Sequence, residues 1–343
     1  SFKNDLFGGT MKKILLIATG GTIASKYTQD GLSPQISAEE LLSYIPAAST
    51  FCTIDTLQPF SLDSTNISPQ HWIQLAALIE KKYEFYDGFV ICHGTDTMAY
   101  TAAALSYLIQ NNRRPVVITG AQKPIDLAIT DARSNLLDSL LFASHDRAHG
   151  VSIVFGGKVI AGTRAKKEFS KSYNAFSSIN YPDIASIHDE RIIFYIDDKD
   201  QSTRPLQFYH DMNRKIFLLK LVPGIDGHIL DMLADSYDGL IIESFGVGGL
   251  PDYGDSSFQA SLETWISSGK IVCMATQVTH EGSDLEVYQV GKMIKERFPI
   301  LESYDMTLEA SVTKLMWALA QTRDYDACRQ LFYTTINHDL LFV

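Results

Sequence analysis

The chain has 343 residues, enough for two domains of ordinary size, and its 45% hydrophobic residues are typical of a globular protein. The formal net charge of −11 argues against a nucleic-acid surface, where a basic stripe is expected, and no apolar run is long enough to span a membrane. The four cysteines form no C-x-x-C pair and the nine histidines show no metal-ligand spacing, so we expect no metal site.

The first predicted element is a strand near the N-terminus. Residues 1–10 look like an expression remnant, and we expect the natural start at Met11. The apolar run over residues 14–17 is too short for a signal peptide and ends in the glycine-rich residues 19–22, which favours a buried strand. Without a signal peptide, and with cysteines typical of buried free thiols, we expect a cytoplasmic protein.

Short apolar runs then alternate with amphipathic segments along the chain. The runs predict strands over residues 13–19, 89–92, 116–119, 151–155, 215–221, 240–243 and 271–275. Helix starts are indicated by Ser37, which opens a capping box, by Ser68 followed by Pro69, and by Asp131; Gly269 indicates a helix end. This alternation predicts an α/β fold with a largely parallel sheet.

A polar stretch without periodicity divides the predicted elements into two groups. We interpret residues 197–213 as a linker between domains. The larger N-terminal α/β domain then covers residues 11–196, with a mostly parallel sheet flanked by helices. The smaller C-terminal α/β domain, which we expect to be Rossmann-like, covers residues 214–343.

Glycine and threonine follow three of the predicted strands. The sequences are Thr-Gly-Gly-Thr at residues 19–22, Cys-His-Gly-Thr at residues 92–95 and Thr-Gly-Ala at residues 119–121. Because parallel α/β sheets bind ligands outside the carboxyl ends of their strands, we expect the three sequences to converge on one site. Neither the dinucleotide fingerprint nor the P-loop is present, so we expect no organic cofactor.

Each motif also has a structural explanation when it is taken alone. The glycines can form a turn, Asp96 or Thr97 can cap the next helix, and Lys166 and Lys167 can lie on a solvated face. A chemical explanation requires a base beside a threonine hydroxyl. No Ser/His/Asp order is evident, which leaves a lysine as the natural candidate.

Together the motifs resemble the bacterial-type L-asparaginase family. Its T-G-G-T-I sequence stands intact at residues 19–23 and its H-G-T-D-T sequence at residues 93–97, and the resemblance runs from Lys12 to near the C-terminus. The R-x-x-K sequence at residues 164–167 and the lack of a signal peptide look more like the cytoplasmic type I branch than the periplasmic type II branch.

The resemblance implies a set of catalytic residues. Thr22 matches the first nucleophilic threonine, and Tyr27 matches the tyrosine that polarises it and closes the site. Thr95, Asp96 and Lys167 match a Thr-Lys-Asp triad. Lys167 is preferred over its neighbour because the family places the lysine three residues after the arginine. The loop after Tyr27 is then expected to be a mobile lid.

The resemblance also implies how a substrate is held. Asp63, Ser64 and Thr65 match the segment that binds the substrate's α-carboxylate, with Ser64 as the expected hydroxyl ligand. Asp96 accepts the α-ammonium and, with its neighbour Thr95, counts among the substrate-binding residues. Ala121 matches the position whose backbone carbonyl holds the side-chain amide.

The expected activity is hydrolysis of L-asparagine to L-aspartate and ammonia, by a homodimer or homotetramer with no nucleic-acid or membrane partner. Glutaminase-asparaginases of relaxed specificity share the motifs and are the nearest alternative. The catalytic subunit of an archaeal tRNA-dependent amidotransferase also shares them, but it has an extra N-terminal domain, for which a start at Met11 leaves no room. A non-catalytic amino-acid-binding protein is the alternative from another class; the threonines and lysine disfavour it.

Overall fold

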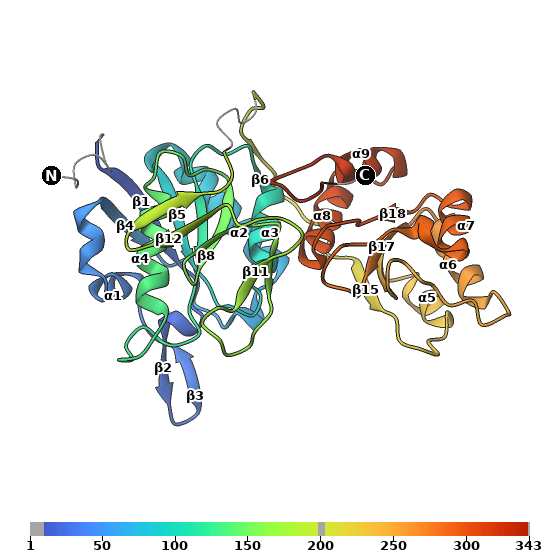
Figure 1. The fold of residues 1–343 in the computed structure, drawn as a ribbon, viewed down its shortest axis with the longest axis horizontal. Helices are drawn as coiled ribbons and strands as arrows, with labels where there is room; N and C mark the ends of the chain where they lie inside the picture. Colours follow the sequence, from blue (N-terminus) through green and yellow to red (C-terminus); the bar gives the residue numbers. More distant parts are fainter. Residues whose placement is uncertain (1–9, 198–202, 342–343) are drawn as a thin grey trace. The chain divides into compact units, whose positions relative to one another are not determined.

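The computed structural model describes residues 10–197 and 203–341, which form two compact units, Ser1–His210 and Asp211–Val343 (Figure 1). The division falls within residues 197–213, the range predicted as a linker, of which residues 198–202 lie outside the described residues. Part of that range is strand β14 (Gln207–Phe208), which pairs with β6 (Ile109–Gln110) of the first unit.

The first unit contains an eight-stranded sheet in the order β13-β12-β9-β8-β7-β5-β1-β4. Five neighbouring strands are parallel. Their bounds are Cys52–Leu57 for β4, Lys12–Ala18 for β1, Gly88–Cys92 for β5, Val116–Thr119 for β7 and Val151–Phe155 for β8. The other three are antiparallel to their neighbours: β9 (Lys158–Ala161), β12 (Ala185–His188) and β13 (Arg191–Phe194). The predicted mostly parallel sheet is confirmed.

Helices cover this sheet on both faces. They are α1 (Ala38–Ser43), α2 (Pro69–Lys82), α3 (Met98–Leu108) and α4 (Ala132–Ala143). Every residue of β5, β7 and β8 is buried, which requires cover on each side. Residues of α1 and α4 pack in one cluster with Leu16, Val90 and Val117, whereas α3 contacts β7 and β8 with side chains outside that cluster.

The predicted helix starts agree with the structure. Ser37 is the N-cap of α1, and its hydroxyl accepts a hydrogen bond from the backbone N–H of Glu40 at 3.1 Å. Ser68 is the N-cap of α2, with Pro69 as its first residue, and Asp131 is the N-cap of α4.

Hairpins join several strands of the first unit. Strands β8 and β9 are joined by Gly156-Gly157, whose φ angles of 58° and 74° suit the tight turn. Strand β10 (Ala165–Lys167) pairs with β11 (Phe176–Ser178). The third hairpin shortens the loop expected after Tyr27: Thr28 belongs to β2 (Ser25–Thr28) and Gly31 to β3 (Gly31–Pro34), and only Gln29 and Asp30 form the turn between them. Its side chains are mostly exposed, so it lacks the alternating pattern of a half-buried strand.

The second unit is a smaller α/β domain built on four parallel strands in the order β15-β16-β17-β18. Their bounds are Ile216–Lys220, Gly239–Ser244, Ile271–Thr276 and Leu301–Glu302. The helices are α5 (His228–Leu233), α6 (Ser257–Ser267), α7 (Gln289–Arg297), α8 (Leu308–Gln321) and α9 (Tyr325–Tyr333). Helix α6 ends just before Gly269, as predicted. None of the helices in the described parts of the chain is long and apolar enough to cross a membrane.

Candidate active site

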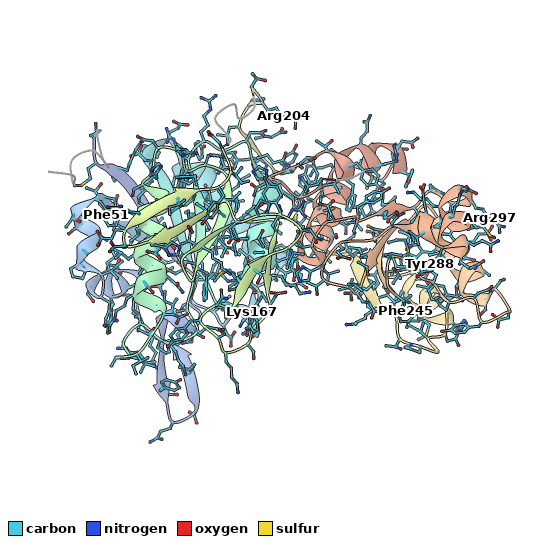
Figure 2. All side chains as sticks on the ribbon, in the orientation of Figure 1. Phe51, Lys167, Arg204, Phe245, Tyr288 and Arg297 are labelled. Carbon is cyan, nitrogen blue, oxygen red and sulfur yellow. The ribbon has the colours of Figure 1, made fainter. Side chains whose placement is uncertain are left out.

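Three side chains predicted from the sequence meet in one hydrogen-bonded cluster. Lys167, labelled in Figure 2, ends β10, and its Nζ donates to Thr95 Oγ1 at 2.8 Å and to Asp96 Oδ1 at 2.7 Å. The Lys167 side chain is 17% exposed and that of Asp96 61%, so Asp96 lies on the solvent side of the cluster. Because β10 is extended, the side chain of Lys166 points to the opposite face.

Glycines let the strand ends of the first unit pack backbone against backbone. Gly20 and Gly21 have φ angles of 105° and 80°, which favour glycine, and a Cβ on Gly21 would overlap the backbone nitrogen of Gly94. A Cβ on Gly94 would lie 2.6 Å from Ser64 Oγ. The ends of β1 and β5 and the turn at Ser64 therefore converge, which places Thr22 in the turn that contacts the residue before Thr95.

Thr22 begins the short 3₁₀ helix η1 (Thr22–Ala24) directly after the glycine pair. The turn is anchored because Ile23 is buried in the core and Ser25 Oγ donates to the carbonyl of Gly21 at 2.7 Å. The Thr22 side chain is half-buried, and its hydroxyl makes no hydrogen bond to any residue that the structure describes. It is therefore open to a ligand.

Tyr27 is not brought to this cluster. It lies on the β2–β3 hairpin opposite Leu32, and its side chain is 59% exposed. Within residues 10–197 and 203–341 its hydroxyl has no hydrogen-bond partner, so no bond to Thr22 is present.

The predicted carboxylate-binding segment forms a second 3₁₀ turn, η3 (Ser64–Asn66). Asp63 is its N-cap, and the Asp63 carboxylate accepts the backbone N–H of Thr65 at 3.0 Å, so this carboxylate shapes the turn. Thr65 is exposed, whereas Ser64 is 3% exposed. Thr97 Oγ1 donates to the carbonyl of Ser64 at 2.8 Å and so ties the turn to the start of α3.

The segment after β7 supplies a residue that the sequence analysis missed. Ala121 is buried. Its neighbour Gln122 donates its backbone N–H to both carboxylate oxygens of Asp131, at 3.0 and 2.9 Å. The side chain of Gln122 reaches Thr95. Its position directly after the Thr-Gly-Ala sequence was the only indication that Gln122 belongs to the site, because a single glutamine forms no recognisable sequence motif.

A buried network behind the cluster fixes the peptide before Thr95. Trp72 Nε1 donates to Thr101 Oγ1 at 3.0 Å, Thr101 Oγ1 lies 2.8 Å from His93 Nε2, and His93 Nδ1 lies 2.6 Å from the carbonyl of Gly94. Burial lowers the pKa of His93 to about 4, so the ring is neutral at neutral pH. A carbonyl only accepts, so Nδ1 carries the hydrogen and Nε2 accepts from Thr101.

This network also orients a backbone donor. The C=O and N–H of a trans peptide point in opposite directions, so turning the Gly94 carbonyl toward His93 turns the Thr95 N–H away from it. That N–H has no hydrogen-bond partner among the described residues. Two threonine hydroxyls, a lysine on one of them and an open backbone N–H are the parts that acyl transfer requires. No group of His, Cys, Asp and Glu in the described ranges is placed to hold a metal ion.

Comparisons with known proteins place this chain in a family. The protein-family model described as "Asparaginase, N-terminal" matches residues 13–199. The family model described as "Glutaminase/Asparaginase C-terminal domain" matches residues 215–332. An L-asparaginase of Thermococcus kodakarensis is 37% identical over 96% of this chain and 99% of its own length. A component of the glutamyl-tRNA(Gln) amidotransferase of Pyrococcus abyssi is 32% identical over 94% of this chain and 76% of its own length.

Solved structures of L-asparaginases also superpose on this chain. The thermostable L-asparaginase from Thermococcus kodakarensis superposes with a TM-score of 0.89 at 35% identity, over 96% of this chain and all of that one. L-asparaginase I from Vibrio cholerae gives a TM-score of 0.86 at 27% identity, over 97% of this chain and all of that one. Two family models that together match most of the chain, and a relative aligned over nearly its full length, show that this protein belongs to the asparaginase family of amidohydrolases.

Proposed function

We propose that the protein hydrolyses L-asparagine to L-aspartate and ammonia. The observation that carries the proposal is that Lys167 Nζ contacts both Thr95 Oγ1 and Asp96 Oδ1, beside the turn that presents the free hydroxyl of Thr22. The similarity to L-asparaginases supports the choice of substrate.

Asparagine is a small zwitterion, and the site offers a partner for each of its groups. The hydroxyls of Ser64 and Thr65 donate to the α-carboxylate, and the carboxylate of Asp96 accepts from the α-ammonium. The carbonyl of Ala121 accepts an N–H of the side-chain amide. Asp63 acts indirectly, because its carboxylate holds the turn that carries Ser64 and Thr65.

In the first step the Thr22 hydroxyl oxygen attacks the side-chain carbonyl carbon. The negative charge that develops on the carbonyl oxygen is stabilised by the open backbone N–H of Thr95. The proton of the attacking hydroxyl passes to the amide nitrogen, the C–N bond breaks and ammonia leaves, giving a β-aspartyl ester on Thr22. Tyr27 polarises the attacking hydroxyl, and since it is now exposed, we assign this contact to closure of the β2–β3 hairpin.

In the second step water attacks the ester carbon. Lys167, acting as the neutral amine, accepts the hydrogen of the Thr95 hydroxyl while that hydroxyl takes a proton from the attacking water, and the carboxylate of Asp96 stabilises the ammonium that forms. The ester C–O bond breaks, the proton held on Lys167 returns through the Thr95 hydroxyl to the Thr22 oxygen, and aspartate is released. The balance of the two steps is asparagine plus water giving aspartate plus ammonia.

The test is ammonia release by the pure protein with asparagine and with glutamine, compared by kcat/KM. The proposal expects asparagine to be preferred. Equal rates would indicate a glutaminase-asparaginase, and binding of asparagine without ammonia release would indicate an amino-acid-binding protein. Either result would overturn the proposal as stated.

We further propose that the protein works as a cytoplasmic homodimer or homotetramer. The support is similarity to L-asparaginases, together with the four cysteines, which are free and buried in the structure. Light scattering coupled to size-exclusion chromatography measures the number of chains per particle, and a monomer at micromolar concentration would contradict the proposal.

A further inference from the structure

The side-chain amide of Gln122 is hydrogen-bonded at both its nitrogen and its oxygen. Its Nε2 donates to the backbone carbonyls of Phe169 at 3.3 Å and Ser172 at 3.0 Å, and its Oε1 accepts from Thr95 Oγ1 at 3.4 Å. Two carbonyl acceptors on one side require the NH₂ group there, so the amide oxygen faces Thr95. The orientation of the amide therefore follows from its neighbours.

This contact determines where the hydroxyl hydrogen of Thr95 points. The hydroxyl has one hydrogen, which goes to Gln122, so its oxygen is left to accept the N–H of Lys167. The bond to Gln122 is long for an O–H donor, and hydrogen bonds of active sites commonly shorten in the substrate complex. In the resting site Gln122 thus sets the direction of the hydrogen on the hydroxyl that Lys167 holds.

The other two bonds of the amide reach the segment between β10 and β11. Phe169 is 50% exposed, and Lys171 and Ser172 are exposed as well. Gln122 belongs to a different part of the fold, and its own backbone is fixed by the carboxylate of Asp131, the N-cap of α4. A fixed residue therefore holds an exposed segment that begins two residues after Lys167.

From this geometry we infer that Gln122 is a positioning residue, which ties residues 169–172 to the hydroxyl of Thr95 through one amide. The inference rests on the proposed function, in which Thr95 activates water. It predicts that loss of the amide disturbs the orientation of the Thr95 hydroxyl and releases the exposed segment together.

The decisive variant is Gln122→Met, which keeps the length of the side chain and removes its donors and acceptor. We expect kcat for asparagine to fall about 10- to 100-fold, in line with the loss of one or two hydrogen bonds at the reacting group, while KM changes less than about threefold. We also expect trypsin to cleave after Lys171 about tenfold faster in the native protein. Gln110→Met is the matched control, because that amide bonds the carbonyl of Tyr107 instead.

Gln122→Glu separates the two roles, since it keeps an oxygen toward Thr95 but loses both donors. It should be cleaved after Lys171 as fast as Gln122→Met and should keep more of the wild-type kcat. An unchanged kcat or an unchanged cleavage rate in Gln122→Met, with Gln110→Met at wild-type values, would overturn the inference. If the wild type releases no ammonia, the proposed function fails, and the cleavage rates still decide whether Gln122 holds the segment.

Discussion

The Thr95 side and the Tyr27 side of the candidate site are held in different ways. Thr95 is 6% exposed, receives a hydrogen bond from Lys167 and follows a peptide that His93 fixes from behind. Tyr27 is 59% exposed on a two-stranded hairpin, without a hydrogen bond from its hydroxyl among the described residues. Under the proposed function, the half of the site that activates water is preorganised, and the half that contains Tyr27 forms when the hairpin closes.

Removing either threonine hydroxyl should have the largest effect. We expect Thr22→Ala and Thr95→Val each to reduce steady-state kcat by about a thousandfold or more, as loss of a nucleophile or its activating group does elsewhere. Both proteins should unfold at nearly the wild-type temperature, measured by circular dichroism. Turnover within about tenfold of wild type in either variant would remove that threonine from the mechanism.

The two adjacent lysines should differ almost as strongly. Lys167→Met removes the group that contacts Thr95 and Asp96 and should lose about a thousandfold in kcat. Lys166→Met changes a side chain on the opposite face of β10 and should stay within about threefold of wild type. Steady-state kinetics of the pair check this, and the reverse order of activities would show that the catalytic lysine has been misassigned.

Tyr27→Phe should give an intermediate loss, about 10- to 100-fold in kcat, because it removes a polarising hydroxyl and leaves both threonines in place. Its thermal unfolding should not change, since the hydroxyl is unbonded within the described residues. Tyr253→Phe is the matched control, an exposed tyrosine of the second unit. If Tyr27→Phe and the control have equal kcat, hairpin closure has no part in catalysis.

The smallest effect concerns stability rather than rate. Burial lowers the pKa of His93 to about 4, below its ordinary value of 6.5, so the folded state favours the neutral ring. The neutral ring therefore contributes roughly 3 kcal/mol to the free energy of unfolding. This contribution is fully present above about pH 6.5 and is lost as the pH falls toward 4. Urea unfolding of the wild type and of His93→Gln at pH 7.5 and at pH 5 measures how the free energy of unfolding changes with pH in each protein. The variant should show the smaller pH dependence, and identical pH dependence would refute the assignment.

The parts of the fold that the sequence predicts are those with strong local patterns. The central strands β1, β5, β7 and β8 consist mostly of apolar residues because both faces of the sheet are covered. Strands β9, β12 and β13 were not predicted because each has only four residues, and the pairing of β9 with β12 joins segments that are distant in the sequence. The β2–β3 hairpin was not predicted because most of its side chains face solvent and its sequence shows no hydrophobic periodicity.

In the candidate site, too, only the residues that belong to local sequence patterns could be predicted. Thr22, Thr95 and Asp96 stand out because glycine-rich strand ends mark them, and Lys167 because a family motif does. The contact between Lys167 and Thr95 joins residues 72 positions apart, which no local pattern specifies. Gln122 was missed for this reason: its importance lies in three partners that only the folded chain brings to it.

The most direct test of the account is to follow Thr95→Val through a single turnover with asparagine. Thr22 should still attack, so we expect one equivalent of ammonia per protein chain, followed by accumulation of a protein heavier by one β-aspartyl group. Peptide mapping by mass spectrometry should place that group on Thr22. Ammonia release without an adduct, or an adduct on any other residue, would contradict a mechanism in which Thr22 attacks and the Thr95–Lys167 pair resolves the ester.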